Sequence, residues 1–393
     1  MARSKVALLS CLVLALLVLP AAAARAQSVQ PKIVGGSQTP IERYPWQAAV
    51  VVSPAKATGN AHERQYCGGS LITPSIVLTA AHCLYDNDPD CDPSDDVEVC
   101  LPGDPTGDGT KRVDPDDVDV VLGVSKLSTA LPEDEHSVQD VSYHPGFNPE
   151  TFQDDVGYLV LSAPVELTPA IQTIDLAGDD EAAVWAPDTL VDISGWGSTF
   201  EGGGTVDNLR AANVPIVADS TCGSILIYGD EFDPTTMVCA GHLEGGVDTC
   251  NGDSGGPLES ALEGGGYRLV GITSWGFGCA ESAAPGVYTR IAQAAPGGLR
   301  DDVVAKVAEL ETTYSLTPEN IVGSGGQPLV RPPDDPPPPP TTSEPIPVTP
   351  TPPSPPTAPA PRARDPFAKC RKAKSKKKRK RCNRKVKLSL KSR

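Results

Sequence analysis

The chain has 393 residues, 50 of them Asp or Glu and 33 Lys or Arg, and its formal net charge is −17. This length allows one large domain, or two of ordinary size, with flanking tails. Crossing a bilayer takes roughly 20 consecutive apolar residues, and no segment of the chain reaches that length, so we expect a protein without a transmembrane segment.

The first 26 residues have the features of a secretory signal peptide. Arg3 and Lys5 precede an apolar run at residues 6–19, and Ala24 and Ala26 are the small residues that a signal peptidase requires. A membrane span is the alternative, but the run is too short for one. We therefore expect a secreted, extracellular protein.

Short β-branched runs follow Trp46 and continue to Tyr288, and Gly, Pro, Asn and Asp separate them. This spacing predicts an all-β sandwich or barrel. A helical period occurs only at residues 299–310. The strand-like runs are Ala48–Val52, Ser70–Ile72, Ile76–Leu78, Val118–Leu122, Val156–Leu161, Leu190–Ile193 and Leu269–Ser274.

Residues 313–361 are predicted to be a linker. The sequence there turns to Gly and then to Pro with Ser and Thr, and from about residue 323 it holds too few apolar side chains for a core. Such a composition favours an extended, polyproline-like spacer. The folded part of the chain is therefore expected before it.

Residues 362–393 form a basic tail, with 17 Lys and Arg against the single Asp365. Its charge is near +16, while the rest of the chain is near −33. The expected partners are polyanions: cell-wall polymers, anionic membrane surfaces, acidic polysaccharide or nucleic acid. Nucleic acid is disfavoured because no aromatic residues are interleaved for base stacking. A disordered tail without a partner is the alternative.

Ten cysteines remain once the signal peptide and Cys11 are removed. An even number of cysteines in an exported chain implies disulfide bonds. Zinc ligation is the competing interpretation, but no pair has the CxxC spacing that brings two thiolates to one ion. We expect neither a metal nor a cofactor.

The strongest local signal for chemistry is the glycine-rich turn at residues 252–257, which contains Ser254. Glycine on both sides of a serine lets the backbone approach a substrate and leaves N–H groups free for a developing oxyanion. His82 follows a strand-like run, next to Cys83. Asp155 opens a buried apolar strand, where an acid requires a hydrogen-bonding partner; Asp154 is the alternative but lies outside the apolar register.

These residues resemble the chymotrypsin and trypsin family, in which His, Asp and Ser follow one another along the chain. The resemblance covers residues 33 to about 310. It implies two packed six-stranded antiparallel β-barrels with a C-terminal helix, in a protease domain at residues 33–312. The further motifs that carry it are Ile33–Gly36, Tyr66–Leu71, Ser194–Gly197, Ser274–Gly276 and Pro285–Tyr288.

The resemblance implies a serine endopeptidase acting on protein or peptide substrates, and a monomer. Ser254 is the expected nucleophile, His82 the base and Asp155 the residue that orients it. The N–H groups of Gly252 and Ser254 would form the oxyanion hole. Ser274 and Gly276 match the segment that pairs with the substrate backbone.

Specificity and activation follow from the same resemblance. Asp248 matches the acid at the base of the primary pocket, which favours Lys or Arg, and Gly276 and Gly286 match the small residues that leave it open. A surface acid beside Cys250 is the alternative. Residues 27–32 would be a propeptide, because a cut between Lys32 and Ile33 frees an amino group that the family pairs with the acid at Asp253.

Disulfide pairing is also taken from the family. It implies three bridges, and the leftover cysteines then pair locally, although spacing alone proves none of these. The expected bridges are Cys67–Cys83, Cys222–Cys239, Cys250–Cys279, Cys91–Cys100 and Cys370–Cys382.

Residues 86–117 form an acidic insertion after the expected catalytic histidine. Alternating acids suggest a calcium loop, but Cys91 and Val97 stand where an EF-hand needs Gly and Glu. Val124 likewise replaces the Glu expected in the calcium loop of the family. We expect a solvated loop that attracts basic substrates at low salt.

Two other classes of function compete with an active endopeptidase. One is a binding protein on an inactive protease fold, which the intact His82, Asp155, Ser254 and Asp248 disfavour. The other is a surface factor that acts chiefly through its tail, with proteolysis secondary.

Overall fold

The computed structural model describes residues 33–85, 112–293 and 297–330. The predicted signal peptide, the propeptide, most of the acidic insertion, the basic tail and the bridges Cys91–Cys100 and Cys370–Cys382 lie outside these residues. No helix among the described residues is long and apolar enough to cross a membrane.

The first half of the described chain forms a closed six-stranded antiparallel barrel, in the order β2-β3-β4-β7-β6-β5. Its strands have valine, leucine and isoleucine on the inward face, and these side chains make most of the largest buried cluster. The strands are β2 Gln47–Val52, β3 Gln65–Thr73, β4 Ile76–Thr79, β5 Val118–Val121, β6 Glu135–Tyr143 and β7 Gly157–Leu161.

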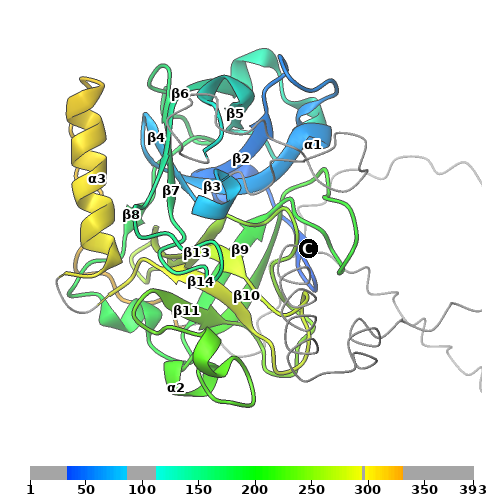
Figure 1. Ribbon diagram of the computed structural model, residues 1–393, viewed down its shortest axis with the longest axis vertical. Coiled ribbons are helices and arrows are strands. Elements are labelled where there is room, and N and C mark those ends of the chain that lie inside the picture. Colours follow the sequence, from blue (N-terminus) through cyan, green and yellow to red (C-terminus); the bar gives the residue numbers. More distant parts are fainter. Residues whose placement is uncertain (1–32, 86–111, 294–296, 331–393) are drawn as a thin grey trace, which may run out of the picture. The chain divides into compact units, whose positions relative to one another are not determined.

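The second half forms another barrel, which closes because β9 pairs with both β10 and β12. Two short strands add to it: β1 Ser37–Gln38 on β10, and β8 Asp175–Leu176, which runs parallel to β13. The two barrels confirm the predicted fold (Figure 1). The strands of the second are β9 Leu190–Gly195, β10 Arg210–Val217, β11 Met237–Ala240, β12 Pro257–Ala261, β13 Tyr267–Trp275 and β14 Gly286–Arg290.

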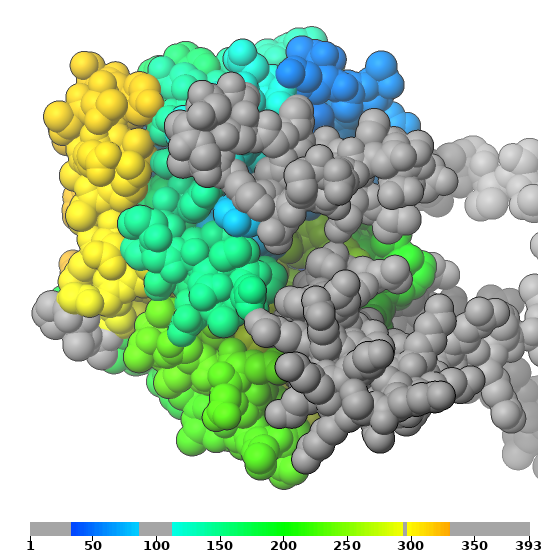
Figure 2. All heavy atoms as spheres, viewed as in Figure 1, coloured from blue at the N-terminus to red at the C-terminus, as the bar shows by residue number. Residues whose placement is uncertain are grey.

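Helices are short apart from α3, Leu299–Thr313, which begins where the sequence predicts it and ends three residues later. Its buried residues Val303, Val307 and Leu310 pack with the core of the first barrel, so the helix lies along the outside of that barrel (Figures 1 and 2). The others are α1 Ala61–Arg64, α2 Asp219–Cys222 and the 3-10 turns Ile41–Arg43, Ala81–Cys83, Pro115–Asp117, Leu127–Thr129, Pro132–Asp134, Ala182–Trp185 and Gly229–Glu231.

The residues that follow α3 pack on the folded domain, so a linker that begins at residue 313 is not what the structure shows for residues 314–330. Residues 314–330, here called the C-terminal strap, pack back onto the second barrel. Ile321 is 3% exposed, its carbonyl accepts from the Leu176 amide at 2.7 Å, and the Leu329 amide donates to the Ala261 carbonyl at 2.8 Å. Backbone hydrogen bonds hold this segment where its apolar side chains are few.

A buried carboxylate anchors the strap. Glu181 is fully buried, accepts from the Gly326 amide at 2.7 Å and forms an ion pair with Arg268 at 2.9 Å. A side chain at Gly323 would collide with the Arg268 guanidinium. The glycines that suggested a linker are therefore also the residues that let the strap approach this pair closely.

The end of the acidic insertion also belongs to the first barrel. Asp117 is 1% exposed, and one of its carboxylate oxygens lies 2.5 Å from the ammonium nitrogen of Lys56. The backbone carbonyl of the same residue accepts from the Ser53 amide at 2.8 Å. This last part of the insertion is therefore structural rather than a solvated loop.

Ending the chain at Thr313 should destabilise the fold, because it exposes the site of Ile321 and removes a donor from Glu181. Loss of one buried aliphatic side chain costs roughly 2–5 kcal/mol, which for a domain of this size lowers the melting temperature by about 5–15 °C. Thermal unfolding of this chain is compared with that of a chain ending at Val330. Equal melting temperatures would show that the strap adds no stability.

Candidate active site

His82 and Asp155 meet at the end of two neighbouring strands of the first barrel. Strand β4 runs into the short turn that holds His82, and Asp155 lies just before β7, which pairs with β4. The Asp155 carboxylate lies 2.8 Å from His82 Nδ1 and accepts from the His82 amide at 2.8 Å. A fully buried carboxylate at Nδ1 fixes the proton there and leaves Nε2 as the acceptor.

The second barrel also holds Asp155. Ser274 on β13 donates its hydroxyl to the carboxylate, and Thr289 on β14 donates to the Asp155 backbone carbonyl at 2.7 Å. Sequence reasoning assigned Ser274 to substrate pairing and missed this contact, which joins residues 119 positions apart. Asp154, the alternative acid, instead lies 3.9 Å from His144.

Ser254 lies on a turn that packs against β3 and against the end of β4, the strand that leads to His82. Its carbonyl accepts from the Gly68 amide at 2.7 Å and lies 3.7 Å from the sulfur of Cys83. A side chain at Gly255, whose φ is 80°, would lie 2.1 Å from the Thr79 hydroxyl. No hydrogen bond joins Ser254 Oγ to His82 among the described residues, and such bonds are often loose without a substrate.

The amide groups of Gly252 and Ser254 are free of acceptors in the described part of the chain. Gly252 has a φ of 91°, which only glycine adopts readily, and its carbonyl accepts from Gln65 Nε2 at 2.7 Å. Two backbone donors without partners beside a serine hydroxyl can stabilise an anionic oxygen.

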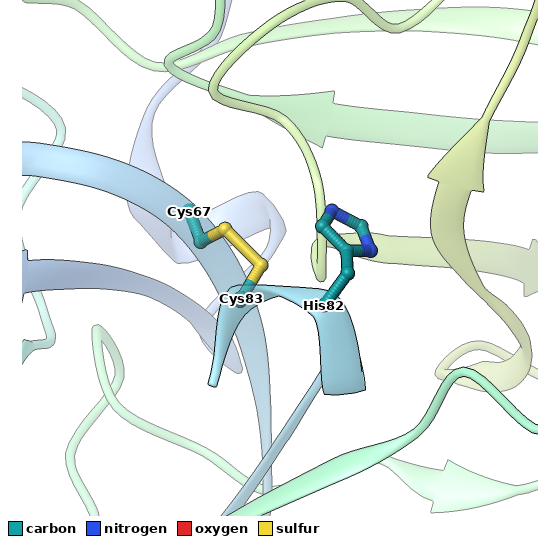
Figure 3. Close-up of side chains that lie close together, drawn as sticks. All are labelled: Cys67, His82 and Cys83. Carbon is teal, nitrogen blue, oxygen red and sulfur yellow. A yellow bond between two sulfur atoms is a disulfide. The ribbon is translucent and has the colours of Figure 1, made fainter. Parts of the chain in front are cut away.

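Cys67, Cys83 and His82 lie close enough to suggest a metal site (Figure 3). The two sulfur atoms are bonded to each other, however, so neither is a thiolate that could hold an ion. The bridge instead ties the turn bearing His82 to β3. The structure also contains Cys222–Cys239 and Cys250–Cys279, the other two pairings that the resemblance implies.

Asp248 lies in the second barrel and is 3% exposed. It accepts from the amides of Thr249 and Ala280, both at 2.9 Å, and no cationic side chain pairs with it among the described residues. Burial raises its pKa to about 7. A side chain at Gly286 would lie 2.7 Å from its carboxylate, so glycine there keeps the acid accessible.

Phe152 is a residue of the site that sequence reasoning missed. Its ring packs edge-on against His82 with centroids 5.6 Å apart, and its φ is 58°. No local pattern distinguishes this phenylalanine from a core residue. Gly276 was predicted to keep the pocket open. A Cβ at this position would have only the Gly278 carbonyl within 3.5 Å.

Asp253 is a second buried carboxylate without a cation among the described residues. It is 1% exposed and accepts only from the amides of Gly197 and Cys250, at 2.7 and 2.9 Å. Burial raises its pKa to about 7. Ile33 is fully buried, and its neighbour Val34 accepts from the Asp248 amide at 3.1 Å.

Comparison with known proteins agrees with this arrangement. Residues 33–296 match the family model described as trypsin. A trypsin from Saccharopolyspora erythraea is 38% identical over 259 residues, 66% of this chain and 93% of that protein. Serine proteinase stubble of Drosophila melanogaster and serine protease 56 of Homo sapiens are 33% and 34% identical, and the matches span 30% and 37% of their lengths. The chain belongs to the trypsin family and is a serine-type endopeptidase.

Proposed function

We propose that the protein cuts peptide bonds after Lys or Arg. The observation that carries this proposal is Asp248, a buried carboxylate that has two backbone donors and no cationic partner among the described residues. A Lys or Arg side chain of the substrate would supply the missing charge and return the pKa of Asp248 toward its usual range. A neutral side chain would leave the carboxylate unpaired, which is costly.

The chemistry would proceed through Ser254, His82 and Asp155. His82 Nε2 takes the proton from the Ser254 hydroxyl as its oxygen attacks the scissile carbonyl, and later gives it to the leaving amine. Asp155 stabilises the imidazolium because it is fully buried and already bonded to Nδ1. The free amides of Gly252 and Ser254 would bind the oxyanion. Water then hydrolyses the acyl-enzyme.

The intact charged residues also speak against a pure binding role. An inactive fold has no need to keep Asp155 buried beside His82, since an unused charge in that position only costs stability. The same two side chains serve directly in peptide hydrolysis.

Activation would follow a cut between Lys32 and Ile33. The backbone of Ile33 has a φ of 26°, a value that β-branched residues rarely adopt. A free amino group at Ile33 would relieve this conformation and could pair with Asp253, whose buried carboxylate has only two amide donors. Because the bond follows Lys, the enzyme itself could make the cut.

The rest of the proposal concerns where the protease acts. The apolar run at residues 6–19 supports export, as do the disulfide bonds in the described chain. The basic tail at residues 362–393 would hold the enzyme on a polyanionic surface.

Replacing Ser254 by Ala tests the nucleophile. After cleavage at Lys32, the wild type should hydrolyse a Lys or Arg amide and be inactivated by a serine-directed acylating agent. The variant should lose at least roughly 10³-fold in kcat, because only binding and the oxyanion hole remain. Ser220→Ala, on the exposed side of α2, is the matched control. No turnover by the activated wild type would contradict the proposed function.

Replacing Asp248 by Ser tests the pocket. The kcat/KM for Lys and Arg substrates should fall by roughly 10³-fold or more, while that for neutral side chains should change little. Asp116→Ser, an exposed acid far from the pocket in sequence, should leave the preference intact. Retention of Lys and Arg selectivity by Asp248→Ser would show that another group reads the substrate.

The pairing of Ile33 with Asp253 predicts a difference in pH dependence between the uncut and cut chains. In the uncut chain, the raised pKa of Asp253 means that its protonated form is stable. Stability is therefore full below about pH 4 and declines as the pH rises through about 7. In the cut chain, the new ammonium should lower that pKa, and the pairing should raise the pKa of the amine above its usual value near 8. Stability should then be full up to about pH 8 and decline as the pH rises beyond it.

Melting temperatures measured between pH 5 and 9 in the Ser254→Ala background test this difference. We expect the cut chain to melt about 5–10 °C above the uncut chain near pH 7, and Asp253→Asn to abolish the gap. Parallel curves for the two forms would contradict the pairing.

A further inference from the structure

Lys and Arg are scarce in the folded part of the chain. The described residues contain ten of them, against 37 Asp and Glu. Seven of the ten lie inside a strand or a helical segment, and only Lys56 and Lys126 are exposed. An enzyme with the proposed specificity would therefore find few bonds to cut in the described part of its body; Lys111, at the end of the acidic insertion, lies outside the described residues.

Most of these cations are also held by partners. Arg64 binds Glu135 through both carboxylate oxygens and donates to the Val52 carbonyl. Arg268 likewise donates to both carboxylate oxygens of Glu181. A protease binds its substrate as an extended strand with the basic side chain inserted in the pocket. Cleavage at these residues therefore requires local unfolding of the helix or strand that holds each of them.

The two exposed lysines are protected as well. Lys56 pairs with the buried Asp117 at 2.5 Å, and its amide donates to the Ser53 carbonyl. Lys126 lies 3.6 Å from Asp207, and the residue after it, Leu127, is fully buried. Of the two, Lys56 lies in the more open turn, because Ala57 after it is half-exposed.

The sequence beyond the strap has the opposite character. Residues 332–361 contain no Lys or Arg. Arg331 precedes Pro332, whose ring restricts the residue before it. The tail then carries 17 Lys and Arg, beginning with Arg362, which precedes the small residue Ala363. The first bond after a Lys or Arg beyond the described body that does not precede proline is therefore the one between Arg362 and Ala363.

The described residues and the tail have opposite net charges, which favours binding of the tail to the folded domain. The described residues have 27 more acids than bases, and the tail is near +16. Thirty Pro-rich residues in an extended polyproline conformation span up to roughly 90 Å. A tether of this kind gives the tail a high effective concentration at the cleft of its own chain or of a neighbour.

We propose that the enzyme removes its own basic tail at Arg362–Ala363 while its folded body resists it; this rests on the proposed preference for Lys and Arg. Ser254 Oγ bonds to the Arg362 carbonyl carbon, the bond to the Ala363 nitrogen breaks, and His82 delivers the serine proton to that nitrogen. Water then adds its hydroxyl to the Arg362 carbonyl carbon, the ester bond to Ser254 Oγ breaks, and the second proton of the water passes through His82 to Ser254 Oγ. The tail is thus a releasable anchor.

Intact mass measurement over time tests the proposal on the full chain cut at Lys32. A species spanning residues 33–362 should accumulate at least tenfold faster than any cut within the described residues, and a cut at Lys56 should be the first of those. The Ser254→Ala chain should keep its tail until a trace of active enzyme is added. Arg362→Gln should move the new terminus to Arg364 or beyond without changing hydrolysis of a small Lys peptide.

The outcomes separate this proposal from the proposed function. An enzyme that hydrolyses the Lys peptide but keeps its tail, or that cuts its body as fast as its tail, would overturn self-removal and leave the specificity standing. Failure to hydrolyse the Lys peptide would instead contradict the specificity itself.

Discussion

The burial of Asp155 between the two barrels is the constraint on which the site depends. A charged carboxylate without access to water requires several donors, and these come from both halves of the chain: His82 from the first barrel and Ser274 from the second. Thr289 of the second barrel donates to the backbone carbonyl of the same residue. Residues of both barrels therefore complete the environment of the Asp155 carboxylate. Separation of the barrels would remove the Ser274 donor from the buried Asp155 carboxylate. The docking of the barrels and the orientation of His82 by Asp155 are therefore coupled.

Two further buried carboxylates differ from Asp155 in one respect. Asp248 and Asp253 each have two backbone donors but no cationic partner among the described residues, and burial raises the pKa of both to about 7. A cation beside such an acid would stabilise its charged form and lower its pKa. In our proposal one receives it from the substrate and the other from the newly cut chain. The same physical device then serves selectivity at one position and activation at another.

Local motifs made much of this site predictable. The turn around Ser254, the segment of His82 and the strand after Asp155 have patterns that short stretches of sequence carry, and the seven strand-like runs became strands. The other strands were missed: β6 has only three apolar residues among nine, without alternation, and β10 contains Pro215. The full set outside the predicted runs is β1, β6, β8, β10, β11, β12 and β14. Ser274 and Phe152 act through contacts with distant residues that no spacing reveals. The strap was mistaken for linker because its glycines fit against Arg268 rather than loosen the chain.

The strap also has a mechanical consequence. If the tail is bound to a surface, any pull on the chain reaches the fold at Val330, next to the hydrogen bond between Leu329 and Ala261. The force then acts on the hydrogen bond from the Gly326 amide to the Glu181 carboxylate before it reaches α3. A helix that packs on the first barrel is thereby shielded from tension, and the active site between the barrels can keep its geometry while the enzyme is held in flow.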